Sequence, residues 1–203
     1  LDESVGQATC SLTPVAAHYV LHCQTDIQAF KVELPGSLYQ SDDYSTELTV
    51  RWRGNDLNPV AGEWHARSKE RASFWRLEPA GSGLNLVTDE AGTTQTVSLP
   101  ESVLLPYEWP WRFMALPFDD GLGQQANYAW PSLWQPETES SVPAVEEMAV
   151  IVAGAEPVTT PVGNFIAWQV KMGRWTAWYD VNAPHTLLRY EFGSAAYVLT
   201  AVR

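Results

Sequence analysis

The chain has 203 residues, of which 45% are hydrophobic and 18% charged, a composition typical of a globular protein. Its formal net charge of −12 argues against a partner with a phosphate backbone and against anionic membrane surfaces, so we expect no nucleic-acid partner. It has no apolar run near the roughly 18 residues of a membrane-spanning helix, and its start at Leu1 leads us to expect a processed chain that has lost a signal or anchor.

The first elements surround the two cysteines. Residues 17–23 are β-rich, and a turn near Thr13 and Pro14 would bring Cys10 and Cys23 close together. An even cysteine count with hairpin-like spacing and no metal motif predicts a disulfide and an oxidising compartment, with two buried free thiols as the alternative. A disulfide that closes a loop of this size stabilises by roughly 3 kcal/mol in the chain-entropy model.

Strand patterns dominate the rest of the first hundred residues. Residues 27–34 are β-rich and end at a Pro-Gly turn, and residues 48–53 alternate apolar and polar side chains, which predicts a strand with one buried face. Residues 63–70 are polar enough for a helical turn, whereas residues 72–77 look extended. Residues 84–88 and 94–99 flank a short loop and predict a hairpin.

The character of the chain changes between about residues 100 and 147. Half of its 14 prolines lie there, and proline at this density prevents long helices and central strands. We therefore predict an ordered excursion packed by its own aromatic side chains, with a short helical turn near residues 111–116 and a flexible point at residues 135–143.

Five short β-rich segments follow, separated by turn residues. They cover residues 148–154, 162–171, 174–180, 186–192 and 196–202, and tight connections of this kind predict an antiparallel meander. The whole sequence therefore predicts a mainly all-β chain in one domain, residues 1–203, built on a single curved antiparallel sheet or half-barrel with little helix.

The last fifty residues carry a family resemblance. A Thr-Pro-x-Gly-x-Phe hairpin precedes a strand with Trp and Asp, and then a strand that begins near a proline; the residues are Thr160, Pro161, Gly163, Phe165, Trp178, Asp180, Pro184 and Arg189. This pattern resembles a group of uncharacterised exported bacterial proteins. The resemblance implies an extended antiparallel sheet, similar to the half-barrel of periplasmic lipoprotein carriers, and it implies no catalytic residue.

The same motif has a physical interpretation. The Thr160-Pro161 step favours an extended entry into the hairpin, and Gly163 permits a bulge or a close strand approach. Phe165 and Trp178 are predicted to be core residues rather than ligand contacts.

The sequence predicts no catalytic residue, metal site or cofactor. His18 and His22 share one face of a strand but lie about 13 Å apart, too far to bind one ion, even with His65 or His185 nearby. Nucleophile-elbow, phosphate-loop and zinc-protease motifs are absent. The carboxylates of Asp119 and Asp120 are a weak candidate for glycosidase-type chemistry, because a solvated turn explains them better.

The strongest remaining signal is aromatic, since eight aromatic residues lie between residues 107 and 134. We interpret them first as a cover for one end of the sheet, second as the lining of an apolar pocket, and third as a platform for sugars. The candidate ligand-binding residues are Trp109, Trp111, Phe113, Trp130 and Trp134.

These observations leave three functions open. The first is a non-catalytic exported protein, extracellular or associated with the cell envelope through an anchor upstream of Leu1, that binds a lipid or another hydrophobic small molecule. The second is carbohydrate binding through exposed tryptophans, and the third is an envelope hydrolase.

Overall fold

The computed structural model describes residues 6–28, 30–34, 37–41, 43–54, 56–69, 72–81, 83–90, 93–105, 108–115, 118, 125–132, 144–173, 175–192 and 195–201. They form two compact units, one from Leu1–Val103 and one from Leu104–Thr138 with Ala144–Arg203. The single-domain organisation stays a prediction.

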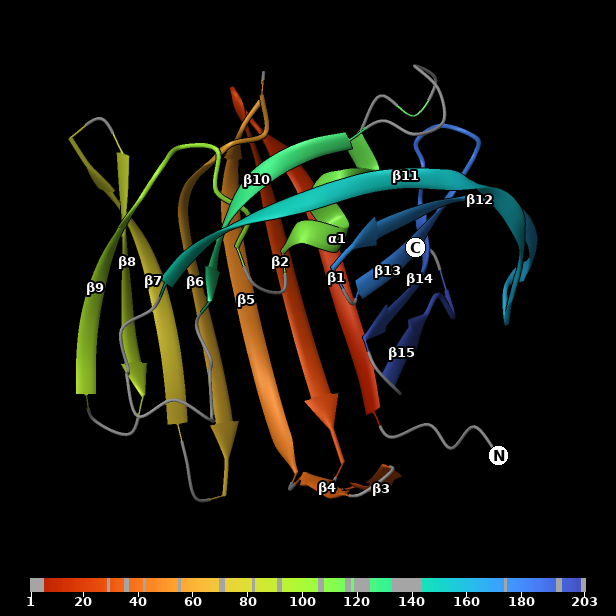
Figure 1. Ribbon diagram of the computed structural model, residues 1–203, viewed down its shortest axis with the longest axis horizontal. Coiled ribbons are helices and arrows are strands. Elements are labelled where there is room, and N and C mark those ends of the chain that lie inside the picture. The colour runs from red at the N-terminus through yellow and green to blue at the C-terminus, as the bar shows by residue number, and fades with distance from the viewer. Residues whose placement is uncertain are drawn as a thin grey trace. The chain divides into compact units, whose positions relative to one another are not determined.

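The first unit contains a seven-stranded antiparallel sheet with the order β1-β2-β5-β6-β7-β8-β9 (Figure 1). Its strands are β1 (Gly6–Val15), β2 (His18–Ile27), β5 (Tyr44–Arg53), β6 (Pro59–Ser68), β7 (Ala72–Ala80), β8 (Gly83–Glu90) and β9 (Thr93–Leu99). A separate hairpin of β3 (Phe30–Leu34) and β4 (Ser37–Ser41) connects β2 to β5 in the chain. The strands β2 and β5 are direct neighbours in the sheet.

Alternation along these strands creates one apolar face and one polar face. Leu48, Val50 and Trp52 of β5 are at most 3% exposed, and the register places Leu21 and Leu77 on the same face. A Cβ at Gly62 would stand 3.3 Å from the Thr49 carbonyl oxygen and 3.4 Å from the Trp75 indole, so the indole packs closely against this glycine. The predicted strand at residues 48–53 and the hairpin of β8 and β9 are confirmed.

Two local predictions in this unit are wrong. The turn between the cysteines is at Ala16 and Ala17, not at Thr13 and Pro14, because β1 runs through Pro14 to Val15. The polar segment 63–70 contains no helical turn in its described part: β6 continues to Ser68, and its charged side chains point to the polar face.

The second unit is a six-stranded antiparallel sheet in sequence order. Its strands are β10 (Gln125–Ser132), β11 (Ala144–Thr160), β12 (Gly163–Met172), β13 (Trp175–Asp180), β14 (Leu187–Phe192) and β15 (Ala195–Val198). The predicted five-stranded meander is confirmed as β11 to β15, and the proline-rich excursion adds β10 at the sheet edge, where Pro131 removes no central hydrogen bond.

The two faces of this sheet carry different clusters. Val170 and Met172 belong to the larger cluster, whereas Ala167 and Trp178 belong to a smaller cluster on the other face. Trp168 packs on the first cluster and Phe165 on the second, as the alternation of β12 predicts. Trp178 is 8% exposed, so its predicted core position is confirmed.

Glycine marks the irregular points of the long strand β11. The β-bulge lies between Val152 and Gly154, not at Gly163, and Figure 1 shows β11 bending along its length. Gly163 instead closes the β11–β12 hairpin with a φ of +146°, in a backbone region that favours glycine. The Thr160 hydroxyl accepts a hydrogen bond from the Val162 N–H at 3.2 Å and orders the turn.

The helical content of the described residues is one short segment, α1 (Trp109–Arg112) followed by the 3₁₀ turn η1 (Phe113–Ala115). It begins two residues before the predicted helical turn. A mainly all-β antiparallel fold with little helix is confirmed, but the strands divide between two larger sheets, because the segment between β9 and β10 interrupts the ladder. Among the described residues, no helix has the length and apolar character needed to span a bilayer.

Candidate functional site

Of the predicted aromatic candidates with described side chains, Trp109 and Phe113 are core residues of the second unit, and Trp111 packs against that core. Trp109 and Phe113 are each 1% exposed, and Trp111 is partly buried against the same cluster. The Trp109 indole packs edge-on against Tyr190, with 5.2 Å between ring centroids, and lies 5.4 Å from Phe113. These rings fill the space on one face of the sheet with protein atoms.

The remaining candidates of the aromatic segment are not placed with side chains. Trp130 lies in β10, but its side chain is outside the described part of the structure. Trp134, Asp119 and Asp120 are outside the described residues altogether, as is the segment 135–143.

A buried polar contact fixes α1 on the sheet. The Tyr179 hydroxyl donates a hydrogen bond to the Pro110 carbonyl at 2.7 Å, and Tyr179 is fully buried. Burial disfavours the phenolate and raises the pKa of Tyr179 well above its usual value. The bond gives the buried hydroxyl a hydrogen-bond partner and joins α1 to β13.

A buried ion pair lies at the start of α1, and the sequence reasoning missed it. Glu108 is 0% exposed and Arg112 is 6% exposed; Glu108 Oε1 lies 3.8 Å from Arg112 Nη1 and accepts a hydrogen bond from the Leu105 N–H at 3.0 Å. The guanidinium also lies 5.5 Å from the Tyr128 ring centroid. The spacing of opposite charges four residues apart could have indicated the pair, but not its burial.

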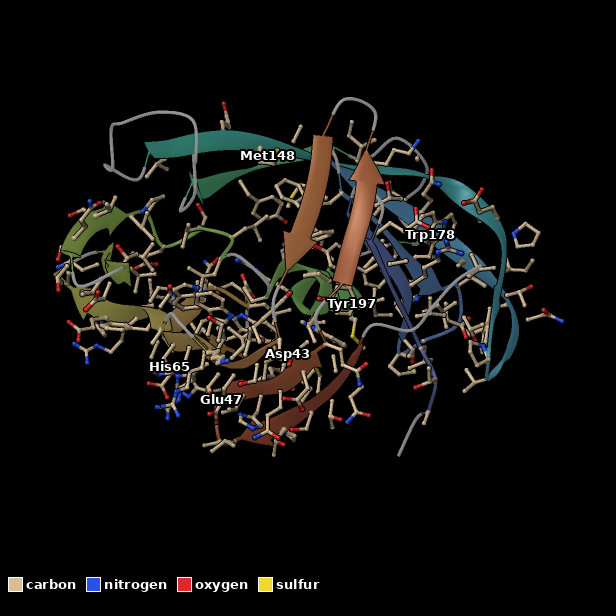
Figure 2. All side chains as sticks on the ribbon, turned by 90° about the horizontal axis from the view of Figure 1, so that it is seen from below. Asp43, Glu47, His65, Met148, Trp178 and Tyr197 are labelled. Atoms are coloured by element: carbon tan, nitrogen blue, oxygen red, sulfur yellow. A yellow bond between two sulfur atoms is a disulfide. The ribbon has the colours of Figure 1, made fainter. Side chains whose placement is uncertain are left out.

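The polar face of the first unit contains a second group of candidates, arranged in two rows across neighbouring strands. The first row joins five strands through direct register partners: Gln24, Glu47, His65, Phe74 and Asp89. The second row follows one pleat further along the strands: Asp26, Ser45, Arg67 and Ala72. Figure 2 labels Glu47 and His65, which lie beside each other on this face.

Two shallow depressions lie along these rows. One has a volume of about 290 Å³ and is lined by Phe74, Ala72, Asp89 and neighbouring residues. The other has a volume of about 390 Å³ and is lined mainly by polar residues, among them Gln24, Asp26 and Glu63. His65 and Arg67 line both, so the two depressions meet at these side chains.

The two depressions differ in chemistry. The first has an aromatic floor, where the His65 and Phe74 rings lie 6.0 Å apart and are tilted by 33°. The second is surrounded by the carboxylates of Asp26, Glu47 and Glu63. With Asp89, four carboxylates and one guanidinium line the pair of depressions, a formal charge of −4 + 1 = −3 with neutral histidine.

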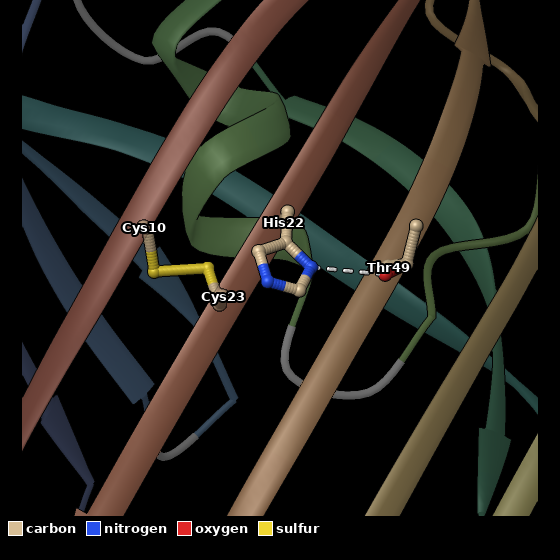
Figure 3. Close-up of a disulfide and its surroundings, with 4 residues drawn as sticks. All are labelled: Cys10, His22, Cys23 and Thr49. Carbon is tan, nitrogen blue, oxygen red and sulfur yellow. Dashed lines mark hydrogen bonds between the residues drawn. A yellow bond between two sulfur atoms is a disulfide. The ribbon is translucent and has the colours of Figure 1, made fainter.

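The histidines on this face are solvent-accessible. His65 Nε2 lies 3.7 Å from Glu63 Oε2, His22 Nε2 lies 4.0 Å from Glu47 Oε1, and both histidine side chains are 41% exposed. His22 also contacts the Thr49 hydroxyl at 3.1 Å across the β2–β5 pair (Figure 3). Exposed pairs of this kind contribute little stability, so their side chains are available to a ligand.

The histidines do not assemble a metal centre among the described residues. His18 and His22 share the polar face of β2 as predicted, and His185 belongs to the second unit, where its Nδ1 donates to the Asp180 carbonyl at 2.9 Å. In the described part of the chain, no group of three potential ligands lies close enough to hold an ion.

Comparisons with known proteins bear on the fold alone. A search of protein-family models finds no match, and no curated protein matches in sequence. One solved structure is similar, the crystal structure of a β-barrel-like protein of the domain of unknown function DUF1849 from Brucella abortus. The TM-score is 0.53 with 7% sequence identity, over 94% of this chain and 83% of that chain, so the chain resembles an uncharacterised β-sheet domain.

Proposed function

We propose that this protein is a non-catalytic exported binding protein whose ligand site is the polar face of the seven-stranded sheet. The observation that carries the proposal is the pair of adjoining depressions that share His65 and Arg67. Their lining comes from register partners on five strands, so the sheet itself holds the side chains in place.

The chemistry of the two depressions suits a carbohydrate. A sugar ring has an apolar face of C–H groups and a rim of hydroxyls that both donate and accept hydrogen bonds. The Phe74 ring offers a partner for the apolar face, the carboxylates accept hydrogen bonds, and Arg67 donates them. Five neighbouring strands span about 19 Å, the length of a short oligosaccharide.

The electrostatics favour a neutral ligand over an anionic one. The lining has a formal charge of −3 and the whole chain of −12, so an anionic headgroup or phosphate is repelled. A cationic ligand is the alternative that this charge permits. The salt dependence of binding distinguishes a neutral sugar from a cationic ligand, because binding of a neutral sugar is nearly independent of ionic strength.

Two features support the non-catalytic and exported parts of the proposal. Both cysteines are joined in a disulfide, which suits an oxidising compartment and removes both thiols as nucleophiles. The histidine–glutamate contacts on the polar face are exposed pairs with distances of 4.0 and 3.7 Å, longer than the hydrogen bonds of a nucleophile–base–orienter arrangement. We place the protein in the cell envelope or outside the cell.

Calorimetric titration with neutral oligosaccharides of glucose and N-acetylglucosamine tests the proposal. We expect Phe74→Ala and Arg67→Gln each to weaken binding by about 1–3 kcal/mol, which is roughly 5- to 150-fold in Kd. Arg76→Gln is the matched control: Arg76 is an exposed arginine of the same face, paired with Glu78 at 2.6 Å, and lies outside both depressions.

Two results would contradict the carbohydrate proposal. One is equal loss of binding in Arg67→Gln and Arg76→Gln, which would indicate a general charge effect. The other is tight binding of spermidine, lost at 0.5 M salt, with no binding of any neutral oligosaccharide.

Binding of a lipid or another hydrophobic molecule is the second candidate. The observation that favours it is the rim of partly buried aromatic residues around the larger cluster of the second unit, among them Trp111, Tyr128, Trp168 and Trp175. A ligand there must displace rings that already pack on one another. Fluorescence titration with a hydrophobic probe tests this candidate, since Trp111→Ala should weaken probe binding while Phe74→Ala leaves it unchanged.

A further inference from the structure

Strand β1 is an open edge of the seven-stranded sheet. It pairs with β2 on one side, and no described strand pairs with its other side. Nine of its ten residues are exposed, and only Cys10 is half-buried. The disulfide to Cys23 nevertheless fastens this strand to the sheet (Figure 3).

The register shows which backbone groups point outward. Cys10 and Cys23 are direct partners with a Cα–Cα distance of 4.1 Å, the short spacing of a non-hydrogen-bonded pair. The two-residue turn at Ala16 and Ala17 leads to the same assignment. The residue pair that closes this turn is hydrogen-bonded, and non-hydrogen-bonded and hydrogen-bonded pairs then alternate along the two strands.

The N–H and C=O groups of Ala8, Cys10 and Leu12 therefore point away from β2. Pro14 falls in the same outward set, where the missing N–H removes no bond between β1 and β2. The free edge thus presents a ladder of backbone donors and acceptors.

Apart from Pro14 near its end, this edge lacks the usual protection against pairing. Natural edge strands often carry lysine or an inward charge, but none of the residues Gly6–Val15 is charged, in a chain with 36 charged residues. Leu12 is 44% exposed and Val15 is 51% exposed. Leu12 lies opposite Leu21, which is 1% exposed, so the apolar face reaches the edge uncovered.

We infer that β1 is an interface for a second copy of this chain, through antiparallel pairing of β1 with β1. A two-fold axis at Cys10 places Ala8 opposite Leu12 of the partner subunit and Cys10 opposite its own copy. Three pairs with two hydrogen bonds each give about six bonds, with every outward N–H of Ala8, Cys10 and Leu12 used.

The same axis matches the side chains. Thr9 falls opposite the partner's Ser11, a polar pair that forms hydrogen bonds across strands, and the small Ala8 falls opposite the larger Leu12. The strip carries no charge, so antiparallel pairing of two copies brings no like charges together across it, although each copy has a net charge of −12.

A charge swap on β1 tests the pairing by sedimentation equilibrium at pH 8. Thr9→Lys with Ser11→Lys puts like charges opposite each other at two places in the dimer. Thr9→Lys with Ser11→Glu puts opposite charges there. Both changes are at exposed positions of the polar face, so neither disturbs the core. We expect a dimer in the wild-type protein, and a dimer dissociation constant about tenfold larger in the Lys/Lys variant than in the Lys/Glu variant.

Amide exchange by NMR checks the orientation of the strand. The amides of Ala8, Cys10 and Leu12 should exchange fast at 10 µM and become protected at 500 µM, while those of Thr9, Ser11 and Thr13 stay protected at both concentrations. A wild-type protein that is monomeric at 500 µM overturns the inference, as do equal dissociation constants for the two charge variants.

Discussion

The bond between Tyr179 and Pro110 yields a prediction with two parts. Tyr179→Phe removes the hydroxyl and leaves the Pro110 carbonyl without the donor that lies 2.7 Å away. Loss of this buried hydrogen bond should lower the free energy of unfolding by about 1–3 kcal/mol at pH 7. Urea unfolding followed by tryptophan fluorescence measures the change.

The second part concerns alkaline pH. Burial raises the pKa of Tyr179 in the folded protein above 10, the usual tyrosine pKa. The stability that the neutral Tyr179 side chain contributes is therefore fully present below pH 10 and is lost as the pH rises above that value. At pH 11 an unfolded chain gains about 1.4 kcal/mol from ionising this group. The deficit of Tyr179→Phe relative to the wild type should therefore shrink by about that amount between pH 8 and pH 11.

Tyr197→Phe is the matched control for the loss at pH 7. Tyr197 is 41% exposed at the edge strand β15, so the same chemical change should alter stability by less than about 0.5 kcal/mol. The reasoning is wrong if both variants lose the same free energy at pH 7, or if the deficit of Tyr179→Phe does not depend on pH.

Two further predictions concern the ion pair and the disulfide. Glu108→Ala leaves Arg112 buried without the Glu108 carboxylate and should lower the free energy of unfolding by about 3–5 kcal/mol in urea unfolding. The double change Glu108→Gln with Arg112→Met removes both charges and should cost clearly less. A double variant that is less stable than Glu108→Ala would contradict this view of the pair. Replacing Cys10 and Cys23 by serine should cost roughly 3 kcal/mol and release the amides of β1 to hydrogen exchange, with β7 and β8 still protected. Loss of protection throughout the sheet would instead show that β1 is not a local unit.

The sequence predicts the fold class well because alternation is a local signal. Leu48, Val50 and Trp52 repeat every second residue, and the structure buries all three. The sequence of segment 63–70 is a weaker strand signal, since β6 places Glu63, His65 and Arg67 on a polar face and has few large apolar residues opposite them. A strand of this kind resembles a polar helical turn in sequence.

Proline and glycine are ambiguous signals in this sequence. Pro14 looks like a turn residue, but an edge strand accepts it where its missing N–H would point outward. The bulge lies at Gly154 rather than at Gly163. Either glycine can adopt the backbone conformation of a bulge, so only the pairing of β11 with β12 decides which of them does.

The candidate site depends on information that no local pattern contains. Glu47, His65 and Phe74 become neighbours only after β5, β6 and β7 pair in a particular register. Gln24 joins the row because β2 pairs with β5 across the β3–β4 hairpin. The aromatic density around α1, in contrast, is visible in sequence, and the structure assigns Trp109 and Phe113 to the core.

The most direct test of the proposed site is amide shift mapping by NMR during titration with a neutral oligosaccharide. The account predicts that the largest shifts follow the two rows on the polar face, around Glu47, His65, Arg67 and Phe74, and that Phe74→Ala removes them. Shifts concentrated around Trp109 and Tyr179 of the second unit, with the polar face unchanged, would contradict it.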